Sequence, residues 1–132
     1  SGPYPRALSG ATLDAGALIA FEKNKRKIVT IVARALEIDE SLAIPAPALA
    51  QVWRDGSRQV RLVRLLASDQ VDIVPLDDFN ARAAGQLCGV SAVQDIVDAS
   101  VVVCAQQRSH RVLTSDSGDL RRIDPTLEIE EV

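Results

Sequence analysis

The chain has 132 residues, the size of one ordinary domain, and a chain of this length buries about two-thirds of its unfolded surface. Apolar residues make up 47% and charged residues 25%, which excludes an intrinsically disordered protein. The formal net charge of −3 excludes nucleic-acid binding through bulk positive charge, but it allows local basic patches beside an acidic site. The chain shows neither a secretory signal pattern nor an apolar run of the roughly 20 residues that cross a bilayer, so we expect a cytoplasmic protein without membrane contact.

The first nine residues differ in character from the rest of the chain. Residues 1–9 contain two prolines, two serines and a glycine without hydrophobic periodicity, which is typical of a flexible arm or a cloning remnant. The folded domain is therefore expected over residues 10–132. Cys88 and Cys104 lie in apolar helical sequence, and we expect buried, reduced thiols rather than a disulfide or a metal site.

Short apolar runs alternate with helical segments along the remaining chain. Pro45 is expected to stop a strand, Gly89 to stop a helix, and Ser57 to cap the helix that follows it. The expected strands are residues 11–14, 42–44, 71–76, 111–114 and 127–129. The expected helices include residues 17–21, 25–38, 47–54, 58–66, 77–87 and 95–105. This alternation predicts a parallel sheet covered by helices on both faces.

Acidic side chains gather at the expected strand ends and helix starts. Asp14 and Asp116 each follow a strand, and Asp95 and Asp98 lie one turn apart on one face of a helix. Ligands bind outside the carboxyl ends of parallel strands. Carboxylates that meet there repel one another unless a cation or protons offset their charge. Because oxygen ligands suit a hard divalent cation, the pattern predicts a Mg²⁺ site.

A purely structural interpretation of these acids stays open, because aspartates also cap helices and fill turns. It suits Asp95 and Asp119 better than Asp14 and Asp98, which lie in apolar sequence where an unpaired charge is costly. The single histidine, His110, is expected at the surface in a polar turn, so zinc is not expected. The sequence contains no glycine-rich phosphate loop, and no spacing supports Ser-His-Asp chemistry.

Four groups of residues, taken together and in this order, closely resemble the motifs of PIN-domain proteins, and most of all those of VapC-like toxins of bacterial toxin–antitoxin pairs. They are residues 13–20, residues 44–47 with 51–53, residues 95–99 and residues 114–120. The resemblance implies a three-layer α/β sandwich around a mainly parallel sheet of four to five strands. It also implies a Mg²⁺- or Mn²⁺-dependent endoribonuclease that acts as the toxin of such a pair.

Carried over to this chain, the resemblance gives the catalytic and metal-binding roles to Asp14, Asp98 and Asp116. Asp119 matches a frequent additional acid of the family, and Asp95 is a further acid beside Asp98. Thr114 is expected to brace the pocket through its hydroxyl group.

Gln51 departs from the family pattern, which usually has glutamate at this place. Glutamine keeps one oxygen ligand but removes a negative charge, so weaker metal binding is expected. Asp55, on the same expected helix, would have to reach back one turn, about 6 Å, to compensate. The alternative function is therefore a catalytically weakened PIN-like module that binds RNA or protein.

Partners follow from the same resemblance and from the basic residues. Basic side chains near the pocket are expected to hold the RNA backbone, although a solvated helix face explains them equally well. They are Lys23, Lys25, Arg26, Lys27, Arg54, Arg58 and Arg61. A small VapB-like antitoxin is expected to cover the pocket, and the amphipathic segment 58–66 favours a homodimer. Trp53 suits stacking on a base less well than packing in the core or an interface.

Overall fold

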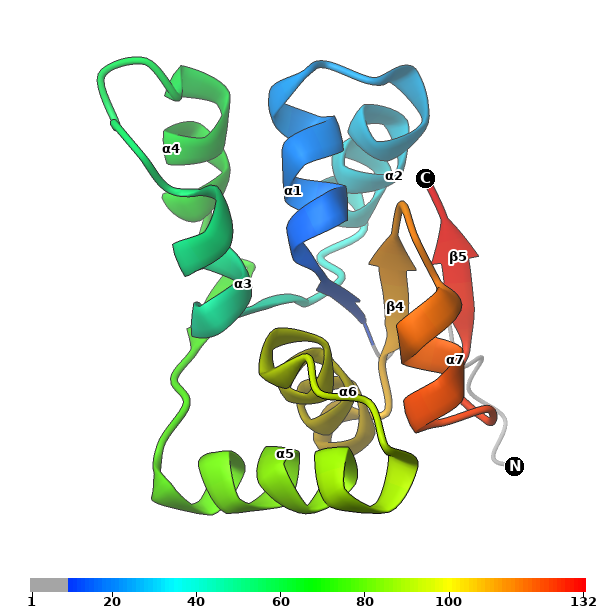
Figure 1. The fold of residues 1–132 in the computed structure, drawn as a ribbon. Helices are drawn as coiled ribbons and strands as arrows, with labels where there is room; N and C mark the ends of the chain where they lie inside the picture. Colours follow the sequence, from blue (N-terminus) through cyan, green and yellow to red (C-terminus); the bar gives the residue numbers. More distant parts are fainter. Residues whose placement is uncertain (1–9) are drawn as a thin grey trace.

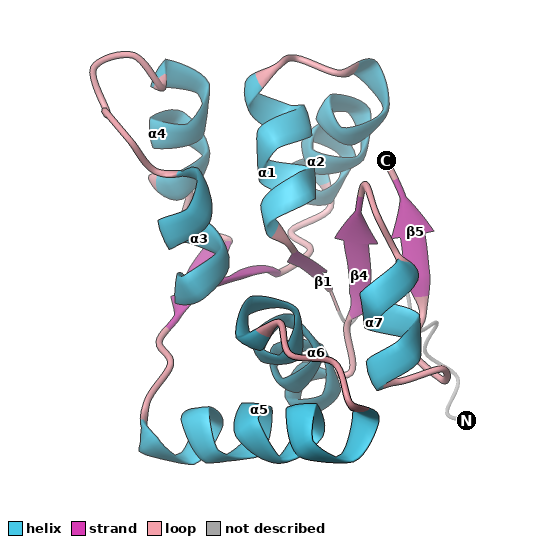
Figure 2. Cartoon of the chain, in the orientation of Figure 1, coloured by secondary structure: helices cyan, strands magenta, loops and turns pink. Residues whose placement is uncertain are grey.

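The computed structural model describes residues 10–132, so the arm expected over residues 1–9 lies outside the described part. Five strands form one sheet in the order β3-β2-β1-β4-β5, and every neighbouring pair is parallel. The strands are β1 (Ala11–Leu13), β2 (Leu42–Pro45), β3 (Val71–Val74), β4 (Arg111–Thr114) and β5 (Ile129–Glu131). The helices are α1 (Ala15–Glu22), α2 (Arg26–Glu37), α3 (Ala46–Val52), α4 (Val60–Leu66), α5 (Asp78–Ser91), α6 (Ile96–Arg108) and α7 (Gly118–Ile123). The expected parallel α/β sandwich is confirmed (Figures 1 and 2).

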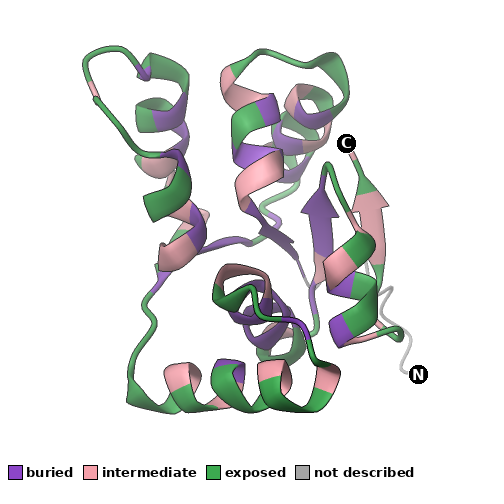
Figure 3. Ribbon diagram, viewed as in Figure 1, coloured by how far each residue is buried: buried purple, intermediate pink, exposed green. Residues whose placement is uncertain are grey.

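The three layers arise because successive residues of a strand point to opposite faces of the sheet. In β4, Leu113 packs into a cluster with residues of α1, α2 and α4, whereas Val112 packs with residues of α5, α6 and α7. In β2, Leu42 and Ile44 join the first cluster, and Ala43 faces the other side. Both faces of the central strands are therefore buried, which explains why these strands are continuous apolar runs (Figure 3).

The strand order changes direction between β1 and β4. After β1 the chain adds β2 and β3 on one side, and after β4 it adds β5 on the other. In an open parallel sheet, a crevice for ligands lies outside the carboxyl ends of the strands at such a point. Leu13 and Leu113 pair across these two strands, so Asp14 and Thr114, the residues that follow them, lie at the same edge of the sheet. The topology thus brings together residues that are about a hundred positions apart.

Aspartate side chains cap three helices of the described chain. Asp14 accepts a hydrogen bond from Ala17 N at 2.8 Å at the start of α1. Asp77 caps α5 and Asp95 caps α6 in the same manner, with bonds of 2.9 Å. Each carboxylate satisfies a helical N–H group and lies at the positive end of the helix dipole.

Two expected helix boundaries were wrong. Gly89 does not stop α5, which continues to Ser91 and ends where Ala92 adopts a left-handed conformation with φ of 61°. Ser57 does not cap α4; its backbone N–H and its hydroxyl both donate to Asp55 Oδ1, at 3.0 and 2.7 Å, and stabilise the preceding turn instead. At Ser57, a turn formed with Asp55, two positions earlier, takes the place of the expected cap.

His110, expected at the surface, is buried with 4% of its area exposed. It lies just before β4, and its Nδ1 is 3.0 Å from Thr12 Oγ1 on the neighbouring strand β1. Gly10 lies against the imidazole ring, and a side chain there would clash with it. The polar residues that precede His110 suggested a solvent-exposed turn, but strand pairing carries its ring into the interior.

No single helix within residues 10–132 is long and apolar enough to cross a membrane. Helices α5 and α6 meet such a length and composition test only as a pair, and they are bent by 112° at the break between them.

Candidate metal centre

Asp14 is the most buried acid at the carboxyl edge of the sheet, with 6% of its area exposed. Its Oδ1 accepts a hydrogen bond from Ala17 N, and its Oδ2 accepts one from the hydroxyl of Thr114, which is fully buried. Burial raises the pKa of Asp14 above its usual value, and the negative charge of Asp116 adds to this, against the two hydrogen bonds. The Asp14 carboxylate is therefore fixed by hydrogen bonds, while its surroundings disfavour its negative charge.

The turn after β4 carries Asp116, which lies at the same edge of the sheet as Asp14. Asp116 N donates to Thr114 Oγ1 at 3.0 Å, so one hydroxyl group links the Asp116 backbone to the Asp14 carboxylate. Asp116 Oδ1 accepts a hydrogen bond from Gly118 N at 3.2 Å, at the start of α7. Gly16 lies so close to the Ser115 hydroxyl that any side chain there would clash. The beginning of α1 and the β4–α7 turn are thus packed directly against each other.

Helices α6 and α7 contribute the remaining acids. One carboxylate oxygen from each of Asp95, Asp98 and Asp119 lies within 4.8 Å of the others. Asp98 is half-buried in the first turn of α6, and Asp119 is half-buried in the first turn of α7. Two of these three acids, Asp95 and Asp119, were expected only in supporting roles.

The surroundings of Asp98 raise its pKa. Burial is the largest cause that raises the pKa of Asp98 to about 6. The negative charges of four further aspartates add to it, in the order Asp95, Asp119, Asp14 and Asp116. The charges of Asp14 and Asp116 thus both act on Asp98, and these two residues are linked to each other through the hydroxyl of Thr114. The role of Asp14, Asp98 and Asp116 as metal ligands stays a prediction.

The donor set fits a hard divalent cation. All five side chains offer carboxylate oxygens, the ligands that Mg²⁺ and Mn²⁺ accept, and the three oxygens within 4.8 Å of one another can reach a common ion. Arg122 approaches Asp119 at 3.5 Å, but the two side chains are 65% and 46% exposed, and a pair so open to solvent contributes little. The negative charge around Asp98 is thus available to a cation.

The raised pKa of Asp98 predicts how the stability of the protein depends on pH. Because the pKa of Asp98 is about 6 in the folded protein and near 3.8 when unfolded, the folded state binds more protons between these values. The free energy of unfolding then falls as pH rises through this window, so without metal the melting temperature is expected to decrease from pH 5 to pH 7.5. Scanning calorimetry in EDTA measures the melting temperature. Added Mg²⁺ should raise the melting temperature more at pH 7.5 than at pH 5. Equal effects of Mg²⁺ at both pH values would contradict the assignment.

Gln51 is exposed on α3 and lines an open groove beside α1. The groove is formed by Ile19, Glu22, Lys23, Gln51, Val52, Arg54 and Gln59. Helix α3 ends at Val52, so Asp55 is not on the same helix as Gln51, and compensation from one helical turn away is ruled out. Glu22, in the last turn of α1, is instead the acid that shares the groove with Gln51. The sequence did not mark Glu22 or Gln59 as functional residues. Glu22 could have been identified, because it is an acid at the end of the helix that Asp14 caps.

The predicted RNA-binding residues are all exposed. Arg54 folds back on α3, where Nη1 donates to the carbonyl oxygens of Trp53 at 2.6 Å and Ala50 at 3.3 Å. Arg58 lies 3.8 Å from Asp55 in an exposed ion pair. Lys25 is the N-cap residue of α2 and Arg26 is its first residue; both lie beyond the end of α1 that is opposite Asp14, and an eight-residue helix is about 12 Å long. Lys25 and Arg26 therefore lie at a distance from Asp14, and the role of all four basic residues in binding RNA stays a prediction.

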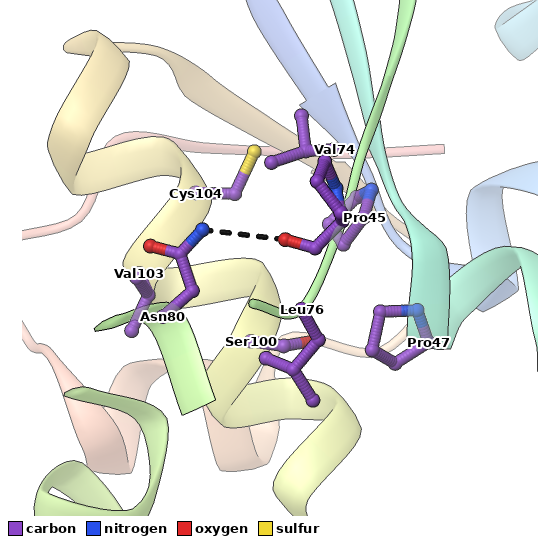
Figure 4. Close-up of a pocket in the computed structure, with 9 residues that line it drawn as sticks. Pro45, Pro47, Val74, Leu76, Asn80, Ser100, Val103 and Cys104 are labelled. Carbon is purple, nitrogen blue, oxygen red and sulfur yellow. Dashed lines mark hydrogen bonds between the residues drawn. The ribbon is translucent and has the colours of Figure 1, made fainter. Parts of the chain in front are cut away.

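A second hollow, between α6 and the connection from β3 to α5, is too small for a ligand (Figure 4). Asn80 Nδ2 donates to Pro75 O across it at 3.3 Å, and Cys104 lies in its wall. Its volume of about 10 Å³ corresponds to one water molecule. We interpret this hollow as a packing gap between α6 and the connection from β3 to α5.

An open parallel α/β sandwich with carboxylates gathered at its switch point is a class of domain that can hold a divalent cation. Within that class the chain belongs to the PIN domain family, whose family model matches residues 11–125. A comparison with curated proteins gives no match. Proteins of the PIN family are in general nucleases, which is the kind of activity that the family membership supports.

Solved structures share this fold at low sequence identity. VapBC2 from Rickettsia felis, bound to a DNA fragment from its promoter, matches with a TM-score of 0.73 and 16% identity, over 92% of this chain and 98% of that one. DNA-bound VapBC from Salmonella typhimurium gives 0.69 and 20%, over 92% and 97%. A toxin–antitoxin complex from Klebsiella pneumoniae gives 0.67 and 19%, over 93% and 100%. These similarities establish the PIN fold over nearly the whole chain.

Proposed function

We propose that this protein is a divalent-metal-dependent endoribonuclease and the toxin of a toxin–antitoxin pair. The observation that carries the proposal is the group of five aspartates at the switch point, where burial and the charges of the other four raise the pKa of Asp98 to about 6. Such a group is costly for a purely structural site, because each charge destabilises the others, and it becomes favourable when a cation binds. Membership of a family of nucleases supports the same conclusion.

In this mechanism Asp14, Asp98 and Asp116 would hold Mg²⁺ or Mn²⁺. Asp95 and Asp119, whose carboxylate oxygens lie within 4.8 Å of one of Asp98, would add negative charge or a further oxygen ligand beside them. The bound ion would supply a Lewis acid that polarises the scissile phosphate and lowers the pKa of water. Thr114 keeps the Asp14 carboxylate in one orientation through its hydroxyl. Asp116, which is exposed in the turn after β4, would orient the attacking water. The exposed residues Lys25, Arg26, Arg54 and Arg58 hold the phosphates of the RNA strand.

The proposed partner is a small VapB-like antitoxin. Two of the similar structures are named as VapBC and a third as a toxin–antitoxin complex, which supports such a partner here. A basic antitoxin side chain placed among the five acids would offset their charge as a cation does, and would exclude the substrate. A homodimer is also proposed, because Val60 and Val63 of α4 are 50% and 39% exposed.

A direct assay tests the proposed activity. Purified protein is incubated with a set of single-stranded and structured RNAs in Mg²⁺, in Mn²⁺ and in EDTA, and the products are resolved by length. Cleavage in either metal and none in EDTA is the expected result. Cleavage that persists in EDTA would contradict the metal-dependent mechanism.

Gln51 favours a second candidate, a weakened PIN-like module that binds RNA or protein without cutting. Its amide stands where the family pattern has glutamate, and it removes one negative charge from the vicinity of the site. RNA binding without any metal-dependent product, across many RNAs, would support this candidate over the nuclease.

Substitution of Gln51 separates the two candidates. Gln51→Glu is expected to tighten Mn²⁺ binding by about tenfold, or about 1.4 kcal/mol, and to raise the cleavage rate, because it adds a negative oxygen ligand. Titration calorimetry of both proteins measures the difference, and Gln51→Ala serves as the control without any ligand atom. Equal affinities for all three proteins would mean that residue 51 does not contact the ion.

A further inference from the structure

Gln59 is a buried amide between helices, with 9% of its area exposed. Its Nε2 donates to Glu22 Oε1 at 2.8 Å and to the carbonyl oxygen of Val52 at 2.9 Å. The first bond reaches the last turn of α1, which lies 37 residues earlier in the chain, and the second reaches the last residue of α3. The side chain therefore ties two helices together from one position just before α4.

The oxygen of the same amide holds the backbone of the intervening turn. Gln59 Oε1 accepts hydrogen bonds from Arg54 N at 2.8 Å and from Asp55 N at 3.0 Å. An amide has two N–H donors and one oxygen with two lone pairs, so all four hydrogen-bonding positions of Gln59 are used. A buried amide with no spare capacity fixes its neighbours, because each broken bond would leave a polar group unsatisfied.

The turn held in this way carries two of the exposed arginines. Arg54 and Arg58 flank Gly56, and the turn's own hydrogen bonds are short-range, such as Arg58 N to Asp55 O at 3.0 Å. Those local bonds shape the turn but do not place it relative to α1. Helices α3 and α4, on either side of the turn, pack against α1 through apolar side chains, and the bond from Gln59 to Glu22 adds a direct polar link to the helix that Asp14 caps.

We propose that Gln59 is a positioning residue that sets the distance between the arginine-bearing turn, residues 53–58, and the acidic centre, so that Arg54 and Arg58 contact the phosphates of one RNA strand. This inference rests on the proposed function. Gln59 itself touches neither RNA nor metal. It acts on substrate binding, because a displaced turn loses phosphate contacts while the acids stay in place.

The test compares Gln59→Ala and Gln59→Glu with the wild-type protein. Gln59→Glu keeps the acceptor for Arg54 N and Asp55 N, but it loses both donors and places a carboxylate against Glu22. Both variants are expected to raise the KM for RNA and the Kd for labelled single-stranded RNA about tenfold, with kcat changed less than about twofold. Loss of one phosphate contact should also lower the slope of log Kd against log salt by about 0.7.

A charge swap provides the rescue. Adding Glu22→Gln to Gln59→Glu supplies an amide donor on α1 for the new carboxylate, which rebuilds the link with its polarity reversed. The double variant is expected to recover most of the lost RNA affinity. The bond to Val52 O stays broken in the double variant, so its melting temperature should remain below that of the wild-type protein.

Gln70→Ala is the matched control. Gln70 also ties two segments together through its side chain, with bonds from Nε2 to Leu36 O at 3.1 Å and to Asp39 Oδ1 at 2.7 Å, but it lies just before β3, at the amino end of the strands. Its loss should lower the melting temperature without changing KM or the salt slope.

The outcomes distinguish this inference from the proposed function. If wild-type protein cleaves RNA and the Gln59 variants keep its KM, Kd and salt slope, only the positioning role is overturned. If wild-type protein binds RNA without cleaving it, the nuclease proposal fails, and the Kd and salt slope still decide the role of Gln59. If wild-type protein does not bind RNA, both are overturned.

Discussion

Replacing Asp98 with asparagine is expected to abolish metal-dependent RNA cleavage while it stabilises the metal-free protein at neutral pH. The rate should fall on the order of 10³-fold, about 4 kcal/mol, because the ion loses a central ligand and with it the polarisation of the phosphate. Asparagine keeps the shape of the side chain, so packing in the first turn of α6 is preserved.

The stability gain has a separate cause. The pKa of Asp98 is about 6 because burial and four neighbouring aspartates disfavour its charged form. Above that pH the folded protein therefore holds an unfavourable charge, which asparagine removes. Calorimetry in EDTA at pH 7.5 should show a higher melting temperature for Asp98→Asn, and the difference should vanish near pH 4.

Asp78→Asn is the matched control for this variant. Asp78 is exposed in the first turn of α5 and pairs with Arg82 at 2.7 Å on the surface, so its loss should change neither cleavage nor the pH dependence of stability. Unchanged cleavage by Asp98→Asn would show that the reaction does not use this centre.

The acids were predictable from the sequence because two simple rules govern them. Strand ends of a parallel sheet share one edge, and helix starts favour negative charge, so aspartates at such positions converge wherever the strand order reverses. Asp14 and Asp116 follow the first rule, and Asp95 follows the second. The motif resemblance then supplied their order, and the family match over residues 11–125 confirmed the fold that it implied.

The residues that were missed depend on contacts between distant segments. His110 lies next to polar residues in the sequence, but its ring packs under β1 through Thr12, 98 positions away. Gln59 has three partners nearby in the sequence, at Val52, Arg54 and Asp55, but its link to α1 depends on Glu22, 37 positions away. Hydrophobic periodicity contains no information about such polar pairs, so only the folded arrangement reveals them.

The fold and the site are also coupled through Thr114, the second residue at which a large effect is expected. Thr114→Val is expected to lower the free energy of unfolding by about 2–3 kcal/mol and to weaken metal binding. Valine has the same shape, but it removes the hydroxyl that bonds Asp14 Oδ2 and Asp116 N, while the bond from Ala17 N to Asp14 Oδ1 remains. The pKa of Asp14, already raised by burial, should rise further, so that protons compete more strongly with the cation.

Two control variants separate these effects. Thr12→Val makes the same change at a fully buried residue of the neighbouring strand, whose hydroxyl bonds His110 Nδ1 at 3.0 Å, so it should cost stability without altering metal affinity. Thr114→Ser keeps the hydroxyl and removes only a methyl group, so it should retain metal binding. Chemical denaturation and calorimetric titration with Mn²⁺ measure both quantities. If Thr114→Val and Thr12→Val bind Mn²⁺ equally well, the hydroxyl of Thr114 serves the fold alone, and the orientation of Asp14 does not depend on it.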